Sequence, residues 1–124
     1  MKPTDEQLRK FWEKLADEVR HFNQDKHRHY RFGEAWTEDE PPLDLNSIFK
    51  YAVPKLEKLG YALFLHPVTK TKRHDAGWNA NFTWLEWLGG RRRERVTNDK
   101  YESTDKDPAL ALFWAIYKVI EDES

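Results

Sequence analysis

The stretch over residues 78–97, WNANFTWLEWLGGRRRERVT, decides the fold that we predict for this chain. Apolar and polar residues alternate over 78–84, which predicts a strand, continuing to about residue 88, with one buried face. That face carries Trp78, Ala80, Phe82 and Trp84. The pair Gly89-Gly90 is typical of a tight turn, so we expect another strand over 92–97 and a hairpin.

A shorter strand is predicted over 61–66, so the sheet has three antiparallel strands. The segment before it has apolar residues at helical spacing. We expect a helix there that starts at Asp44 or Asn46, both good caps, and stops at Gly60 in a left-handed conformation. Pro54 lies inside this helix and lacks the N–H that the helix needs, so a kink or a break is expected there.

The amino-terminal segment predicts an amphipathic helix over 4–22. Thr4 and Gln7 have the spacing of a capping box, in which each side chain bonds the backbone of the other. Residues at helical spacing then form one apolar stripe: Leu8, Phe11, Trp12, Leu15, Val19 and Phe22. Residues 23–43 are expected to be a long connecting loop, extended in part over 29–32, because glycine, prolines and charges interrupt the pattern.

The last helix has a clear start, since Asp107 is a natural cap and Pro108 fits the first helical position. A sheet with one apolar face needs helices packed on it. The sequence therefore predicts an α+β fold, in which a three-stranded antiparallel sheet is layered with helices as an α/β/α sandwich. The N-terminal amphipathic helix is additional. We expect residues 1–124 to be a single domain, with the sandwich over 44–121.

The composition favours a soluble binding domain. The 124 residues include six Trp, seven Phe and five Tyr, and each aromatic residue can bury roughly 150–250 Å². Such a surplus leaves aromatic side chains for a binding surface. Without cysteine the chain has neither disulfides nor thiolate metal sites. No secretory signal and no apolar run of the ~18 residues that a membrane span needs is present, so we expect a cytoplasmic protein.

Patterns of catalytic residues are absent from the sequence. None of the serines lies in a nucleophile-elbow sequence, and no Gly-rich phosphate loop is present. The acidic run over 38–40 is typical of a solvated loop rather than of paired catalytic carboxylates. His21, His27 and His29 could in principle bind a metal, but their basic neighbours would repel a cation. We expect no catalysis, no cofactor and no bound metal.

Two segments interleave basic and aromatic residues and are the candidate binding sites. The first, over 26–32, contributes Arg28, Tyr30 and Arg31. The second, in the hairpin, contributes Trp84, Trp87, Arg91, Arg92, Arg93 and Arg95. Arginine pairs with phosphates, aromatic faces stack on bases, and both residue types anchor protein interfaces. The alternative is that the tryptophans form core and the arginines protect an exposed strand edge.

Residues 41–121 resemble the phage ABA-sandwich domain family of small bacteriophage and prophage proteins. The resemblance is carried by three helix-forming patterns: Pro42-Leu43-Asp44-Leu45-Asn46, Val53-Pro54-Lys55-Leu56 and Asp107-Pro108-Ala109-Leu110-Ala111-Leu112. These patterns describe helix starts and packing. The resemblance implies a layered α/β/α domain and a phage or prophage origin, and it transfers no catalytic or binding residues.

These observations predict a non-enzymatic phage or prophage accessory protein that binds a host or phage macromolecule. A protein partner is the leading hypothesis, and a counter-defence inhibitor of a bacterial immune complex is one version of it. The alternative is binding of a nucleotide or a single-stranded nucleic acid through the basic-aromatic segments, although nucleic-acid-binding domains usually carry more positive charge than a net −1. A homodimer that covers an exposed strand edge is also compatible with the sequence.

Overall fold

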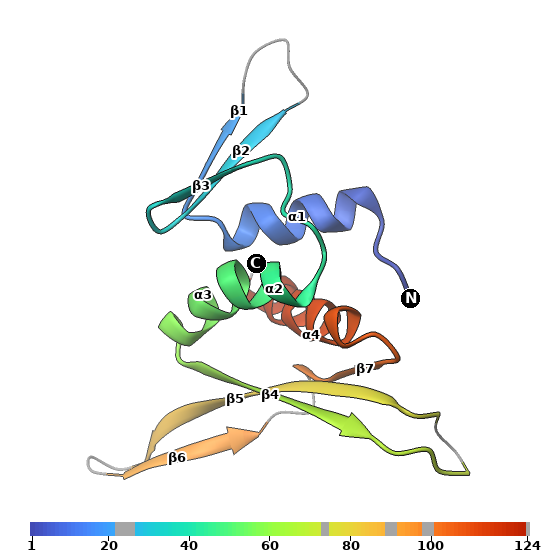
Figure 1. Cartoon of the computed structure of the whole chain (residues 1–124). Helices are drawn as coiled ribbons and strands as arrows, with labels where there is room; N and C mark the ends of the chain where they lie inside the picture. The colour runs from blue at the N-terminus through green and yellow to red at the C-terminus, as the bar shows by residue number, and fades with distance from the viewer. Residues whose placement is uncertain (22–26, 73–74, 89–91, 98–100, 124) are drawn as a thin grey trace.

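The computed structural model describes residues 1–21, 27–72, 75–88, 92–97 and 101–123, although the side chains of 84–88, 92–97 and 123 lie outside the description. Figure 1 shows two antiparallel sheets at opposite ends of the molecule, with the helices between them. The smaller sheet contains β1 (Glu18–His21), β2 (Arg28–Phe32) and β3 (Ala35–Glu38). The larger sheet contains β4 (Tyr61–Val68), β5 (Gly77–Leu88), β6 (Arg92–Thr97) and β7 (Ser103–Asp105).

The helical layer consists of α1 (Asp5–Leu15), α2 (Leu45–Ser47), the π-helical turn η1 (Ile48–Ala52), α3 (Val53–Lys58) and α4 (Pro108–Glu123). The α+β class and the additional N-terminal helix are confirmed. The order of the layers differs from the expected α/β/α sandwich, because the helices lie on one side of the larger sheet and the smaller sheet lies beyond them (Figure 1). The difference arises because a segment expected to be a loop forms a sheet of its own.

The amino-terminal helix is shorter than the predicted 4–22. The capping box of Thr4 and Gln7 is confirmed, but α1 ends at Leu15 and the backbone turns extended at Ala16. Val19, which the helical spacing placed on the apolar stripe, lies in β1 and pairs with Tyr30 of β2. Val19 lies four positions after Leu15, so it fits the apolar stripe of a helix as well as it fits a strand. Its pairing with the next strand, β2, favours the extended conformation.

The connection over 23–43 was expected to be a loop that is extended in part over 29–32. The extended part corresponds to β2, but β3 and the hairpin that joins the two strands were not expected. Side chains at alternate positions of β2 point into the core, and the turn between β2 and β3 has only two residues, since Phe32 pairs with Ala35. Gly33 begins this turn with a φ of +63°, a backbone conformation that glycine adopts without strain. Gly33, which interrupts the helical pattern in the sequence, therefore forms part of a hairpin turn.

Asp17 fixes the point where α1 turns into the smaller sheet. One carboxylate oxygen accepts from the Gly33 N–H at 2.7 Å, and the other accepts from the Lys55 ammonium at 2.9 Å. The bond from the Gly33 backbone, followed by that from Lys55, lowers the pKa of the Asp17 carboxyl below its ordinary value. This one side chain therefore connects the α1–β1 junction to the β2–β3 turn and to α3.

We expect Asp17→Asn to lower the free energy of unfolding by about 1 kcal/mol at neutral pH, because two bonds to a charged acceptor are weakened. The pKa is lower in the folded chain, so this contribution is present above the pKa of the unfolded carboxyl and is lost as the pH falls through the folded pKa. Urea unfolding from pH 7 to pH 2 should thus show the two proteins converging below about pH 4. The control Asp75→Asn removes an exposed carboxylate and should change stability by less than about 0.5 kcal/mol at every pH. A gap that persists at pH 2 would contradict this assignment.

The other helix boundaries follow the expected residues. The Asp44 carboxylate caps α2 by accepting from the Ser47 N–H at 2.7 Å, and the Asp107 carboxylate caps α4 through the Ala109 N–H at 2.8 Å. The left-handed stop at Gly60 is confirmed by its φ of +94°. A kink or a break was expected at Pro54. The structure has the π-helical turn η1 directly before α3, and this wider turn accommodates the proline ring.

The three strands predicted for the larger sheet are confirmed, and β7 is an addition. The central strand β5 pairs with β4 along 77–84, with β6 along 83–88 and with β7 along 78–80. Ala80 and Phe82 of β5 are fully buried against the helices. The expected burial is therefore confirmed for Ala80 and Phe82, whereas Trp78 is partly buried, and Asn79 and Thr83 on the opposite face are buried as well.

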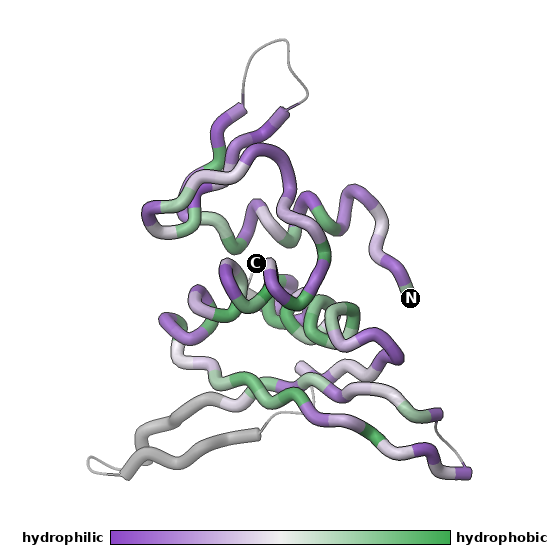
Figure 2. Tube along the Cα trace, viewed as in Figure 1, coloured by the Kyte–Doolittle hydropathy of each residue, from purple (hydrophilic) through white to green (hydrophobic). Residues whose placement is uncertain are grey.

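Aromatic rings connect α1 to the other layers. The Phe11 ring lies 4.6 Å from that of Phe113 in α4, and the Trp12 ring lies 5.7 Å from that of Phe32 in β2, between centroids. The Tyr51 ring of η1 also packs on Phe32, with 4.8 Å between the ring centroids. Figure 2 shows hydrophobic residues concentrated along α4, whereas most of the smaller sheet is hydrophilic. The smaller sheet is thus held by a few inward aromatic residues and presents a polar outer face.

Candidate functional site

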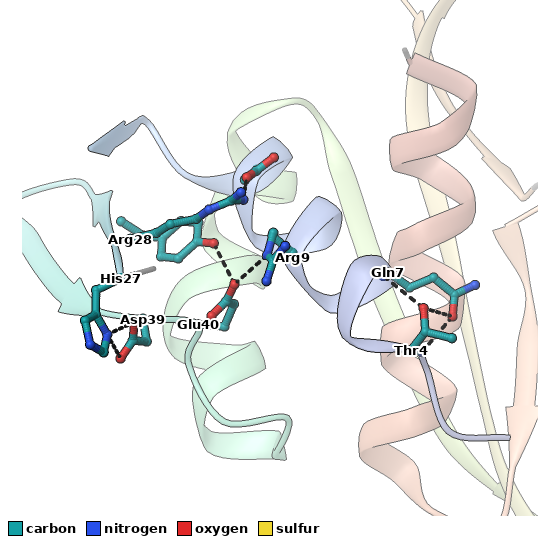
Figure 3. A network of polar contacts seen from close by, with 9 residues as sticks. Thr4, Gln7, Arg9, His27, Arg28, Asp39 and Glu40 are labelled. Atoms are coloured by element: carbon teal, nitrogen blue, oxygen red, sulfur yellow. Dashed lines mark hydrogen bonds and ion pairs between the residues drawn. The ribbon is translucent and has the colours of Figure 1, made fainter. Parts of the chain in front are cut away.

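Two of the predicted binding residues face inward. The Arg28 guanidinium forms an ion pair with the Glu13 carboxylate of α1. Tyr30 is fully buried, and its hydroxyl donates to the Glu40 carboxylate at 3.1 Å. Figure 3 shows that Arg9 of α1 reaches the same carboxylate, at 3.5 Å. The Tyr30 ring is therefore unavailable for stacking on a ligand, and the Arg28 charge is neutralised within the chain.

Burial raises the pKa of the Tyr30 hydroxyl well above its ordinary value, and the adjacent Glu40 carboxylate raises that pKa further. The hydroxyl is consequently a permanent hydrogen-bond donor at physiological pH. A buried tyrosine that donates to a charged acceptor is typical of a structural contact. Tyr30 thus anchors the smaller sheet to the segment that leads into α2.

The opposite face of the smaller sheet carries a second arrangement of basic and aromatic residues. Side chains of directly paired residues lie on the same face of an antiparallel sheet. One row contains Glu18, Arg31 and Trp36, and the next contains Arg20, His29 and Glu38. These six residues, which we call the Arg–Trp face, lie opposite to the face occupied by the core residues Tyr30 and Phe32. Of the predicted site residues, only Arg31 belongs to it.

The Arg20 guanidinium lies over the Trp36 ring, 4.6 Å from its centroid, in a cation–π contact. Glu18 holds both arginines, because its two oxygens accept from Arg20 Nε at 3.0 Å and from Arg31 Nε at 3.2 Å. Arg31 also donates to the Gly33 carbonyl at 2.8 Å. These bonds fix the guanidinium groups in place, while 42% of the Trp36 surface stays exposed.

Charge on the Arg–Trp face is balanced. Hydrogen bonds from Arg20 and then Arg31 lower the pKa of the Glu18 carboxyl, which is therefore ionised at physiological pH. Two guanidinium groups accordingly face two carboxylates, those of Glu18 and Glu38, with His29 between them. An exposed tryptophan with an arginine on its ring, on a surface of little net charge, is typical of the residues that anchor a protein interface.

The second predicted segment lies at the other end of the molecule. The β5–β6 hairpin belongs to the larger sheet, away from the Arg–Trp face (Figure 1). Its backbone register pairs Trp87 with Arg93. Arg91 and the side chains of Trp84, Trp87, Arg92, Arg93 and Arg95 lie outside the described residues. The two predicted segments are not brought together on one surface.

The histidines near β1 and β2 are dispersed. His21 pairs with Arg28 and His29 with Arg20, so the two rings project from opposite faces of the sheet. His27 Nδ1 lies 2.9 Å from the Asp39 carboxylate, and this contact, drawn in Figure 3, lowers the pKa of Asp39. In the part of the chain that the structure describes, no three His, Asp or Glu side chains are grouped as metal ligands.

Comparison with protein-family models, with curated proteins and with solved structures found no match. The resemblance of residues 41–121 to the phage ABA-sandwich domain family therefore stays a prediction. Among the described residues, no helix is long and apolar enough to cross a membrane.

Proposed function

We propose that this chain is a non-enzymatic accessory protein of a phage or prophage, which binds a host or phage protein through the Arg–Trp face. The observation that carries the proposal is the exposed Trp36 ring with the Arg20 guanidinium stacked on it. Tryptophan and arginine are the residue types most enriched among those that dominate binding energy in protein interfaces. A side chain that is already fixed loses little conformational entropy when a partner binds.

Electrostatics favour a protein over a nucleic acid as the partner. Nucleic-acid binding depends on cations that are available to phosphates. Both arginines of the Arg–Trp face are instead bonded to Glu18, and Glu38 adds a second carboxylate to the same surface. Phosphates would have to displace Glu18 and would meet repulsion from Glu38, whereas a protein with mixed polar and apolar groups would not.

The phage or prophage origin in this proposal rests on the resemblance over residues 41–121. In a phage-infected bacterium, a small binding protein of this kind acts in the cytoplasm, and a counter-defence inhibitor that blocks an immune complex is one form of the proposal. Binding alone is sufficient for such a role, because occupying an interface inactivates the complex. Catalytic residues are not required.

The expected result for Trp36→Ala is at least tenfold weaker binding to the partner, because an interface anchor of this type contributes about 2 kcal/mol or more. The partner would first be isolated from host lysate by affinity capture on the tagged protein, and the dissociation constant would then be measured by calorimetry. Phe49→Ala is the matched control, since Phe49 is 45% exposed and lies in η1, outside the Arg–Trp face. Its affinity should change less than twofold.

Salt dependence separates this proposal from nucleic-acid binding. Single-stranded DNA or RNA bound through arginines should weaken steeply with salt, by about 0.7 in log–log slope for each phosphate contact. We expect no such binding at low salt and a shallow salt dependence for the protein partner. Equal loss of partner in Trp36→Ala and Phe49→Ala, or a steep salt slope with nucleic acid, would overturn the assignment.

A further inference from the structure

Two adjoining hollows lie among the helices, away from the outer face of the smaller sheet. The first, of about 210 Å³, lies where the ends of α1, α3 and α4 meet. Its apolar lining consists of Leu15, Leu56, Leu59, Val119 and Ile120. The second, of about 130 Å³, lies between η1, α3 and the β2–β3 turn. Leu15 and Lys55 line both hollows, which are therefore neighbours.

Lysines surround this surface. Lys14 and Lys55 line the first hollow, whose lining contains no carboxylate. Lys50, Lys55 and Lys58 line the second, in which Asp17 is the acidic lining residue. Four ammonium groups thus face one carboxylate around the two hollows, although the whole chain has a net charge of −1.

Most of this positive charge is not compensated within the described chain. Asp17 is bonded to Lys55 at 2.9 Å. Lys14, Lys50 and Lys58 make no ion pair with any described carboxylate, and Lys50 lies 5.2 Å from the centroid of the Tyr51 ring. The Arg–Trp face differs in this respect, because both of its arginines are bonded to Glu18. An apolar hollow beside unpaired cations is complementary to an amphiphilic anion.

We propose that the two hollows form one binding site for a small aliphatic carboxylate. The hydrocarbon chain would occupy the apolar first hollow, and the carboxylate would lie among Lys50, Lys55 and Lys58 at the second. Sites for drug-sized ligands usually measure about 300–1,000 Å³, so the first hollow, of about 210 Å³, suits a single short chain. None of the six residues of the Arg–Trp face lines either hollow, although Arg31 donates to the Gly33 carbonyl at the edge of the second one. Occupation of the site does not depend on the proposed protein partner.

Titration of isotope-labelled protein with sodium octanoate, below its micelle concentration, tests the site by NMR. Octanoate should shift the backbone amides of Leu15, Leu56, Leu59 and Val119. Affinity should rise by up to about fourfold for each methylene added from butanoate to octanoate, and then level off as the hollow fills. Neutral octanol should bind about three- to tenfold more weakly, because it lacks the charge that the lysines attract.

Charge reversal identifies the lysines. The double variant Lys50→Glu/Lys58→Glu should weaken octanoate binding by about tenfold or more, whereas the control Lys70→Glu/Lys72→Glu makes the same change in net charge on exposed residues that line neither hollow. Leu59 is 54% exposed, so Leu59→Glu should fold and should also abolish binding at the first hollow. This second variant keeps the test valid if the lysine variant does not fold.

Three outcomes would overturn the proposal. They are amide shifts confined to other surfaces, equal affinity for octanoate and octanol, and octanoate binding that survives in both Lys50→Glu/Lys58→Glu and Leu59→Glu. An acidic, leucine-bearing peptide that shifts the amides of the two hollows when octanoate does not would assign the surface to a protein segment instead. Octanoate binding can be measured whether or not a Trp36-dependent protein partner is found. The carboxylate site and the protein-binding face are therefore tested independently.

Discussion

Replacing Trp12 by alanine is expected to lower the free energy of unfolding by about 3–5 kcal/mol, which is a large part of the roughly 5–15 kcal/mol typical of a domain. Trp12 is fully buried and, among the described residues, contacts the rings of Phe11, Phe32 and Tyr51. Its removal leaves a cavity where α1, β2 and η1 meet, so all three elements lose packing together. Urea unfolding followed by circular dichroism measures the change.

Trp12→Phe is the matched control for this prediction. Phenylalanine keeps an aromatic ring in place and removes the indole Nε1, a buried donor that has no hydrogen-bond partner among the described residues. An unpaired buried donor costs about 1–3 kcal/mol, so its removal offsets part of the lost packing. We expect a net loss below about 1.5 kcal/mol. A loss under 1 kcal/mol for Trp12→Ala would show that α1 is not packed as described.

Gly77→Ala is expected to destabilise the protein by about 1–3 kcal/mol. A Cβ atom at residue 77 would lie 2.8 Å from the backbone oxygen of Asp105 and 3.2 Å from its carbonyl carbon. Backbone atoms cannot rotate away as the end of a side chain can. The clash must therefore displace β7, which pairs with the start of β5 and directly precedes the capped start of α4.

The loss expected for Gly77→Ala is opposite in sign to the usual effect. A glycine-to-alanine change usually stabilises a protein by about 0.4–1 kcal/mol where the backbone conformation and the space allow a Cβ atom. Gly33→Ala is the comparison: no atom lies within 4 Å of its added Cβ, but its φ of +63° disfavours alanine. That variant should lose about 1 kcal/mol through backbone strain alone, with unchanged amide signals in β7. Unchanged β7 signals in Gly77→Ala, or a gain in stability, would contradict the close contact.

Local signals in the sequence predicted the helix starts, the stop at Gly60 and three strands of the larger sheet. Capping depends on a side chain and on backbone groups two or three residues away, so Thr4, Asp44 and Asp107 could be identified without any tertiary information. The alternation over 78–84 likewise reflects the apolar face of one strand, on which Ala80 and Phe82 are buried. Such features are encoded within a few residues, which is why they were predicted correctly.

The smaller sheet could not be predicted in the same way. Val19 fits the apolar stripe of a helix as well as it fits a strand, and the choice depends on its pairing with Tyr30. β1 and β3 have only four residues each, too few for alternation to be distinguished from a loop with scattered aromatic residues. The information that decides between these structures lies in contacts between segments.

The candidate site was missed for the same reason. Arg28, Tyr30 and Arg31 were grouped because they are close in sequence, whereas successive residues of a strand point to opposite faces. Arg20 and Trp36 come from the outer strands and meet across β2 only when the sheet forms. Had the strand been recognised, its alternation would have separated Tyr30 from Arg31 and indicated which of the two faces solvent.

The contact between Phe11 and Phe113 has a consequence for synthesis on the ribosome. The two rings pack together although about 100 residues separate them in the chain. At about 5–20 residues per second, translation needs on the order of 5–20 seconds to supply the second ring after the first. During that interval the apolar stripe of α1 has no final packing partner in α4. Nascent chains of this protein should therefore be substrates for ribosome-associated chaperones until α4 has been released.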